Sequence, residues 1–207
     1  MKVAIVNYGM GNLGSVRRAL EELGAVPSIA DHPGALFEAH RMVLPGVGAF
    51  AEGMERLRSG GWVEAIHRQV KELGKPLLGI CLGMQMLADG GDEGGATEGL
   101  GLVGVQVRRL DLLGCRLRIP HVGWNDVTHA EADPLFAHVA QGTDFYFVHS
   151  YAVDGAVPGV VSATVEYGAR VVAAVRAGNV FGVQFHPEKS SLAGRQLLRN
   201  FLGYVPC

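Results

Sequence analysis

Apolar residues along the first half of the chain follow two alternating patterns. Short continuous apolar runs are typical of strands buried on both faces of a parallel sheet, and they span residues 3–6, 26–30, 42–44 and 77–80. Between these runs, apolar residues recur at i, i+3, i+4 and i+7, which is the spacing of a helix face. This spacing predicts helices over residues 12–23, 62–73 and 82–88.

The second half has short β-type runs separated by glycines, a pattern typical of hairpins. These runs span residues 101–110, 144–148, 160–165, 171–175 and 180–184, and a last helix is predicted over 192–202. Strands separated by crossover helices form parallel, doubly wound sheets. We therefore expect an open, mostly parallel α/β sheet, with antiparallel hairpins added to it or packed beside it. No repeat or linker divides residues 1–207, so we expect a single domain.

Composition removes several classes of function. No uncharged apolar run approaches the roughly 20 residues that a bilayer span needs, and a formal net charge of −2 provides no basic field for nucleic acid. The three cysteines, Cys81, Cys115 and Cys207, are scattered, which argues against a disulfide framework and favours a reducing cytoplasm. The chain has no C-x-x-C or H-x-x-x-H spacing, so we expect no metal or other cofactor.

Cys81 follows a predicted strand, with Gly79 two residues before it and Gly83 two residues after it. This is the spacing of a nucleophile elbow, where a strand turns sharply into a helix and only glycine lets the backbones pass. A cysteine after an apolar strand is ordinarily a small buried hydrophobe. However, two glycines at a helix start cost about 1 kcal/mol each without a geometric reason. The spacing therefore favours a nucleophile.

His186 and Glu188 follow the last predicted strand, separated by Pro187. Residues i and i+2 of an extended chain point to the same side, and a following proline biases His186 towards the extended region. Because a free thiol titrates near pH ~8.5, Cys81 needs a base to be activated at neutral pH. We expect Cys81, His186 and Glu188 to form an acyl-transfer triad, although Glu188 is also compatible with a solvated loop carboxylate.

In open α/β sheets, ligands bind at the carboxyl ends of the strands. Four segments follow predicted strands in this way, and we expect them to meet at one edge of the sheet: residues 7–14, residues 45–48, the Cys81 elbow and residues 186–188.

The elbow Gly-Ile-Cys-Leu-Gly-Met-Gln, together with the distant His-Pro-Glu, resembles the class I, triad-type glutamine amidotransferases. Four further segments resemble, within that family, the glutaminase subunits of imidazole glycerol phosphate synthase: residues 6–15, 44–50, 121–125 and 146–151. The anthranilate synthase glutaminases typically carry Pro-Gly-Pro-Gly where this chain has Pro45-Gly46-Val47-Gly48. The resemblance covers the whole chain and implies the family's mostly parallel fold.

The resemblance also implies a reaction. Cys81 would attack the side-chain amide of glutamine, His186 would protonate the departing ammonia, and water would cleave the remaining thioester. The backbone N–H groups of Leu82 and Val47 would form the oxyanion hole. In the family, the ammonia passes to a (β/α)8-barrel cyclase subunit, which forms imidazole glycerol phosphate and AICAR in histidine biosynthesis.

Substrate and partner residues follow from the same resemblance. Gly48 and Gln85 are expected at the glutamine head group, the backbone of Ser150 and Tyr151 at its α-carboxylate, and Glu93 at its α-ammonium. Any of these residues is also compatible with a surface or capping role. The resemblance places three residues near the partner, of which Trp124 is also compatible with a core position: Asn12, Trp124 and Tyr146.

Two other readings of the sequence remain. The chain is also compatible with a glutaminase of the same class that supplies a different synthase. A flavodoxin-like binding protein with an incidental elbow is the second alternative, and the His-Pro-Glu segment disfavours it.

Overall fold

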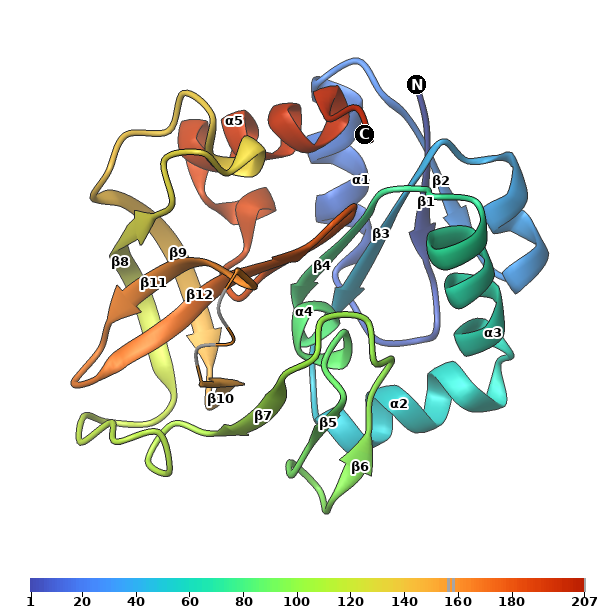
Figure 1. The fold of residues 1–207 in the computed structure, drawn as a ribbon. Helices are drawn as coiled ribbons and strands as arrows, with labels where there is room; N and C mark the ends of the chain where they lie inside the picture. The colour runs from blue at the N-terminus through green and yellow to red at the C-terminus, as the bar shows by residue number, and fades with distance from the viewer. Residues whose placement is uncertain (156, 158, 207) are drawn as a thin grey trace.

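A nine-stranded mixed sheet organises the chain (Figure 1). The computed structural model describes residues 1–155, 157 and 159–206, so Cys207 lies outside the described residues. The strand order is β2-β1-β3-β4-β13-β12-β11-β8-β9. The sequence predicts parallel pairing for four of its first five strands and assigns the fifth, residues 180–184, to a hairpin; that strand pairs in parallel with β4 and antiparallel with β12. The first five strands therefore all pair in parallel. They are β1 (Lys2–Val6), β2 (Val26–Ala30), β3 (Arg41–Gly46), β4 (Leu77–Cys81) and β13 (Val180–Val183).

Antiparallel strands extend this sheet on one side and form a small second sheet beside it. The extension consists of β12 (Arg170–Ala177), β11 (Val161–Glu166), β8 (His121–His129) and β9 (Thr143–His149). The small sheet has the order β10-β7-β5-β6. Its strands are β10 (Tyr151–Asp154), β7 (Gln106–Arg109), β5 (Gly90–Gly91) and β6 (Thr97–Glu98). Both placements predicted for the hairpins are therefore present.

Helices cover both faces of the sheet. The helices α1 (Leu13–Glu22) and α5 (Ser191–Gly203) pack on one face. The other face carries α2 (Phe50–Ser59), α3 (Trp62–His67) and α4 (Leu82–Met86). Short helical turns complete the chain: η1 (Pro33–Glu38), η2 (Arg68–Glu72), η3 (Pro134–Phe136) and η4 (Pro187–Lys189). No helix within the described residues has the length and apolarity of a bilayer span.

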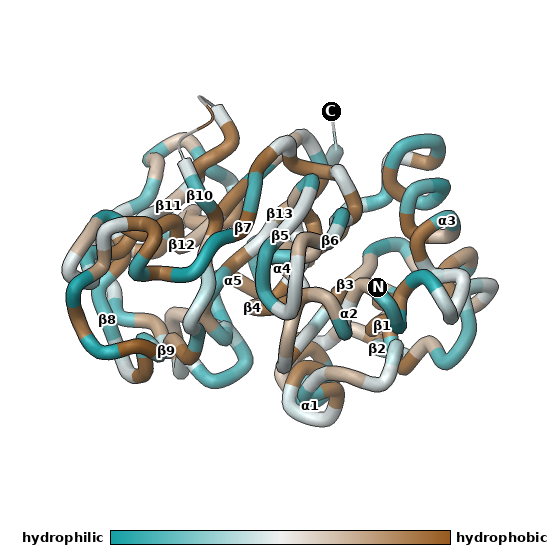
Figure 2. Tube along the Cα trace, turned by 90° about the horizontal axis from the view of Figure 1, so that it is seen from below, coloured by the Kyte–Doolittle hydropathy of each residue, from teal (hydrophilic) through white to brown (hydrophobic). Residues whose placement is uncertain are grey.

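The two hydrophobic cores follow from the twofold alternation of the strands. In β1, Val3 and Ile5 face the core beneath α1 and α5, whereas Ala4 and Val6 face the core beneath α2 and α3. Figure 2 shows that α3 alternates between hydrophobic and hydrophilic residues along its turns, as expected of a helix that packs on the sheet with one face. Because helices cover both faces of the sheet, a ligand can reach it only at the loops that follow the ends of its strands.

Several elements differ from those predicted. The predicted strand 101–110 is wrong for its first half, because Gly101 and Gly104 take φ values of 58° and 64°, which extended chain does not allow. Only Gln106–Arg109 is a strand there. The helix predicted over 62–73 is present, although its last turn, η2, is a π-helix. The sequence reading missed α2 and the long strand β8.

Candidate active site

Cys81 occupies a strained elbow between β4 and α4. Its φ of 54° and ψ of −112° are unusual for a residue with a side chain. A Cβ atom on Gly79 would lie 2.6 Å from the carbonyl oxygen of Gly83, and one on Gly83 would collide with the carbonyl oxygen of Leu44. The two glycines are therefore required by the close approach of strand and helix, and this confirms the predicted elbow geometry.

His186 and Glu188 form a buried pair after β13. The His186 Nδ1–H donates to Glu188 Oε1 at 2.8 Å, and the two side chains are 2% and 1% exposed. His186 is extended, with φ of −100° and ψ of 94°, as Pro187 predicts. The chain does not stay extended, however, because the turn η4 begins at Pro187. The two side chains therefore meet across a turn, and the prediction of an extended segment is wrong.

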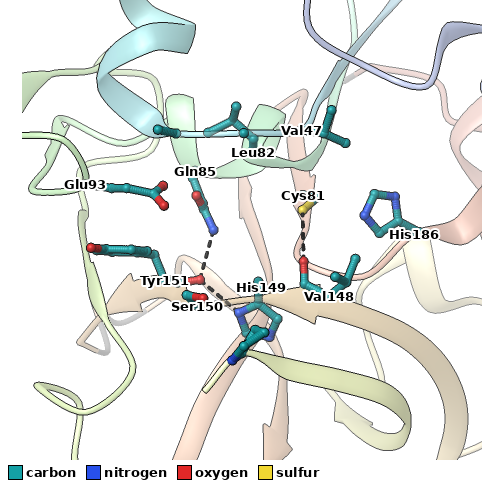
Figure 3. A pocket seen from close by; sticks show the side chains of 13 residues that line it. Val47, Cys81, Leu82, Gln85, Glu93, Val148, His149, Ser150, Tyr151 and His186 are labelled. Atoms are coloured by element: carbon teal, nitrogen blue, oxygen red, sulfur yellow. Dashed lines mark hydrogen bonds between the residues drawn. The ribbon is translucent and has the colours of Figure 1, made fainter. Parts of the chain in front are cut away.

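The surroundings of His186 favour its protonated form. Burial alone opposes protonation, but the neighbouring Cys81 and the hydrogen bond to Glu188 outweigh it and raise the pKa of His186 to about 9. Among the described residues, the buried Nε2 of His186 has no hydrogen-bond partner. Figure 3 shows this ring beside Cys81. The free nitrogen is thus available to the thiol or to a ligand.

A cleft of about 500 Å³ opens over Cys81. Every residue that the sequence assigns to the oxyanion hole or to substrate binding lies in its wall, whereas Glu188 lies behind His186. The lining consists of Val47, Gly48, Ala49, Cys81, Leu82, Gln85, Glu93, Pro120, Val148, His149, Ser150, Tyr151 and His186. The predicted convergence at one edge of the sheet is therefore present.

Close contacts join the remaining strand ends to this edge. A Cβ atom on Gly46 would lie 2.5 Å from the Tyr8 hydroxyl and 2.8 Å from Leu82 Cβ. Gly48 has a φ of 110°, and a Cβ atom there would lie 2.6 Å from the Met10 side chain. The segment after β3 thus fits between the loop after β1 and the elbow only because it carries glycines.

Polar groups line the floor of the cleft in a connected set. The Nε2 of Gln85 donates to the Tyr151 carbonyl at 2.9 Å and to Gln184 Oε1 at 3.0 Å. The oxygen of Gln85 is therefore the part of its amide that remains for a ligand. His149 approaches the same Tyr151 carbonyl with its Nδ1 at 2.9 Å, as Figure 3 shows.

Glu93 and His186 lie towards opposite ends of the cleft in Figure 3. The Phe50 N–H donates to Glu93 Oε2 at 3.2 Å, and this bond holds the carboxylate in place. Burial raises the pKa of Glu93, although that hydrogen bond opposes the shift. Glu93 is thus a fixed, partly buried carboxylate at the end of the cleft away from His186.

An apolar strip adjoins the cleft on strands β8 and β9. Val122 stands opposite Val148, and Trp124 opposite Tyr146. Val122, Trp124 and Val148 are 54%, 53% and 38% exposed. The rings of Trp124 and Tyr146 meet edge to face at 6.0 Å. Trp124 is thus a surface residue, so its alternative assignment to the core is wrong.

Asn12, the third residue expected near a partner, caps α1. Its side-chain oxygen accepts the N–H of Ser15 at 3.3 Å. Capping fully accounts for its place at the helix start. Asn12 remains only partly buried, so a contact with a partner stays a prediction.

Sequence reasoning missed several residues of the site. His149 and Pro120 line the cleft, and Gln184 contacts the cysteine, yet none had been given a role. His149 also lies 3.1 Å from the buried His121 across the β8–β9 pair. For His149 and Gln184 the available signal was a polar residue at the end of an otherwise apolar strand, whereas Pro120 offered no such signal.

Comparison with known proteins identifies the family. The family description "Glutamine amidotransferase class-I" matches residues 4–204. The chain belongs to the class I glutamine amidotransferases. Among similar amidotransferases, the imidazole glycerol phosphate synthase subunit HisH of Moorella thermoacetica is 48% identical over 96% of this chain and 93% of its own length. The subunit HisH of Symbiobacterium thermophilum is 46% identical over 100% of this chain and 95% of its own length.

Solved amidotransferases share the fold. A glutamine amidotransferase crystal structure superposes with a TM-score of 0.77 at 21% identity, covering 97% of each chain. PurLQS from Thermotoga maritima gives a TM-score of 0.74 at 22% identity, covering 98% of each chain. These similarities confirm the predicted amidotransferase-type fold.

Proposed function

We propose that this amidotransferase hydrolyses the side-chain amide of glutamine and passes the ammonia to the cyclase subunit of an imidazole glycerol phosphate synthase. Imidazole glycerol phosphate and AICAR would then form in histidine biosynthesis. The observation that carries the proposal is a buried histidine, paired with Glu188 and with a free Nε2, beside an elbow cysteine in an open cleft. The high identity to HisH subunits supports the choice of synthase.

The geometry is compatible with a two-step reaction through a thioester. The Cys81 sulfur attacks the amide carbon while His186 holds the proton that the leaving ammonia requires. Water then attacks the thioester carbon, His186 takes a proton from this water, and glutamate leaves Cys81. The Nδ1–H bond to Glu188 keeps the other ring nitrogen facing the cleft throughout.

Val47 and Leu82 both line the cleft beside Cys81, which supports the proposal that they serve the tetrahedral oxygen. The amide of Leu82 begins α4 and follows the nucleophile directly. In our proposal, the Val47 N–H completes the oxyanion hole after a rotation of the Gly46–Val47 peptide. One oxyanion donor is worth roughly 10²–10³ in rate, so a partner that favours this rotation would activate the enzyme by that order.

The cleft offers matching groups for the rest of glutamine. Gly48 and the free oxygen of Gln85 suit the head group, Glu93 suits the α-ammonium, and the backbone of Ser150 and Tyr151 suits the α-carboxylate. All five residues line the one cleft. A reducing compartment such as the cytoplasm suits an enzyme whose nucleophile is a free thiol.

The apolar strip of Val122, Trp124, Tyr146 and Val148 is the surface that we propose for the cyclase. Exposed aromatic and aliphatic groups of this kind are typical of binding surfaces. Val148 belongs to both the strip and the cleft. A (β/α)8 barrel docked there would therefore stand beside the point of ammonia release.

Release of ammonia from glutamine tests this function. The purified chain should release ammonia slowly alone and faster when the cyclase subunit and its substrate are added. Absence of hydrolysis under both conditions would overturn the proposal. If a different synthase subunit, but not the cyclase, stimulates ammonia release, the chain is a glutaminase that serves another pathway.

A further inference from the structure

Gln184 is a wholly buried glutamine whose side chain contacts the sulfur of Cys81. Its exposed fraction is 0%, and its Nε2 lies 3.7 Å from Cys81 Sγ. A buried amide is costly unless its polar groups are bonded. Both the oxygen and the nitrogen of this amide therefore need hydrogen-bond partners.

The surrounding hydrogen bonds decide which end of the Gln184 amide faces the sulfur. The Tyr151 carbonyl can only accept, so the Gln85 atom 2.9 Å from it must be the NH₂ nitrogen. The second hydrogen of this nitrogen points at Gln184 Oε1, 3.0 Å away. Gln184 consequently presents its oxygen to Gln85 and its NH₂ group to Cys81.

The second contact of the Cys81 sulfur favours the protonated thiol, whereas the N–H of Gln184 favours the thiolate. Cys81 Sγ lies 3.8 Å from the Val148 carbonyl, to which only a protonated thiol can donate. A thiolate would be repelled by that oxygen. It would instead strengthen the bond from Gln184, because hydrogen bonds to ionised acceptors are the stronger ones.

We propose that Gln184 is a catalytic residue whose side-chain amide stabilises the Cys81 thiolate and fixes its direction. Gln85 and the Tyr151 carbonyl act as positioning groups that keep the NH₂ end of Gln184 on the sulfur. This inference rests on the proposed function only in taking Cys81 as the nucleophile.

Two variants separate the donor from the bulk of the side chain. Gln184→Met keeps the length of the side chain and removes the donor. Gln184→Glu keeps an acceptor for Gln85 but turns an oxygen towards the sulfur. The rate of iodoacetamide alkylation of Cys81 at pH 7, read from the mass of its peptide, should fall about 10–100-fold in the Met variant, the range expected for a hydrogen bond to a charged group. It should fall further in the Glu variant. The kcat for glutamine hydrolysis should fall with it, while KM changes little.

Gln69 provides the matched control. It is also 0% exposed, and it lies in the π-helical turn Arg68–Glu72. In Gln69→Met, Cys81 should be alkylated at the wild-type rate. This result would show that the slower alkylation in Gln184→Met comes from the missing N–H donor and not from the loss of any buried amide. Near-UV circular dichroism verifies that each variant is folded.

Wild-type alkylation of Cys81 in either folded Gln184 variant would overturn the inference. The alkylation assay requires neither glutamine nor the cyclase. A wild-type chain that releases no ammonia would therefore refute the proposed function, whereas unchanged alkylation in the variants would refute the role of Gln184 alone.

Discussion

At the scale of single residues, His186 and Glu188 form one buried pair but act differently. In our proposal the imidazole transfers protons, whereas the carboxylate, which accepts the Nδ1–H of His186, orients the ring and favours its charge. We expect His186→Ala to lower kcat by about 10⁶ and Glu188→Gln by only about 10⁴, the ratio typical of a base and its orienting acid. Partner-stimulated ammonia release measures both values. Equal losses in the two folded variants would show that the roles are misassigned.

His149 makes a second prediction at this scale. Burial lowers its pKa to about 3, despite the hydrogen bond to the Tyr151 carbonyl. Below about pH 6.5 the unfolded chain binds a proton at this histidine and the folded chain does not. The free energy of unfolding should therefore fall by about 1.4 kcal/mol per pH unit on this account as the pH drops from 6.5 towards 3.

Urea unfolding at several pH values, on wild type and His149→Gln, isolates that contribution. The variant should lose stability less steeply below pH 6.5. Identical slopes for wild type and His149→Gln would contradict a neutral buried His149.

At the scale of elements, the close packing of strand and helix at the elbow requires its glycines, whereas it does not require the cysteine side chain. Gly83→Ala would drive a methyl group into the Leu44 carbonyl, so we expect a large loss of stability in thermal unfolding. Gly14 lies in α1 with nothing within 4 Å of its would-be Cβ. Gly14→Ala should stabilise the chain by about 0.4–1 kcal/mol. A harmless Gly83→Ala would disprove the close packing of α4 on β3.

In our proposal, the segment after β3 has a separate role in activation. Val47→Pro removes the proposed oxyanion N–H, and proline still permits extended backbone. We expect it to suppress partner-stimulated hydrolysis roughly 10²–10³-fold and to leave alkylation of Cys81 largely intact. Full stimulated activity in this variant would place the second donor elsewhere.

Periodicity predicted the parallel strands of the first half because they are apolar runs, as in Val3–Val6 of β1, but it gave no strand order. Periodicity failed where the apolar residues of an element are not the ones that the fold buries. The strand β8 alternates regularly between inward and exposed residues, but its exposed positions include the apolar Val122 and Trp124. Its inward positions include the polar His121 and Asn125, so hydrophobicity gave no twofold signal there. The helix α2 was detectable from Phe50, Met54 and Leu57, which share one buried face, but it was overlooked.

At the scale of the whole molecule, the sheet brings together residues that are far apart in sequence. Cys81 and His186 were predictable because glycine spacing and the His-Pro-Glu segment are local signals. The bonds between Gln85, Gln184 and Tyr151 were not, since they depend on how the helix α4 and the strands β10 and β13 pack together. The turn at Pro187 was hidden for a similar reason, because His186 N–H is anchored to the Tyr146 carbonyl of β9.

Detection of a glutamyl group on Cys81 tests the central claim most directly. Wild type turning over glutamine with the cyclase present is quenched in acid, and the mass of the peptide that contains Cys81 is measured. We predict a glutamyl thioester on that peptide in wild type, and neither the adduct nor glutamate production in folded Cys81→Ala. Continued glutamate production by Cys81→Ala, with no adduct in wild type, would contradict the mechanism.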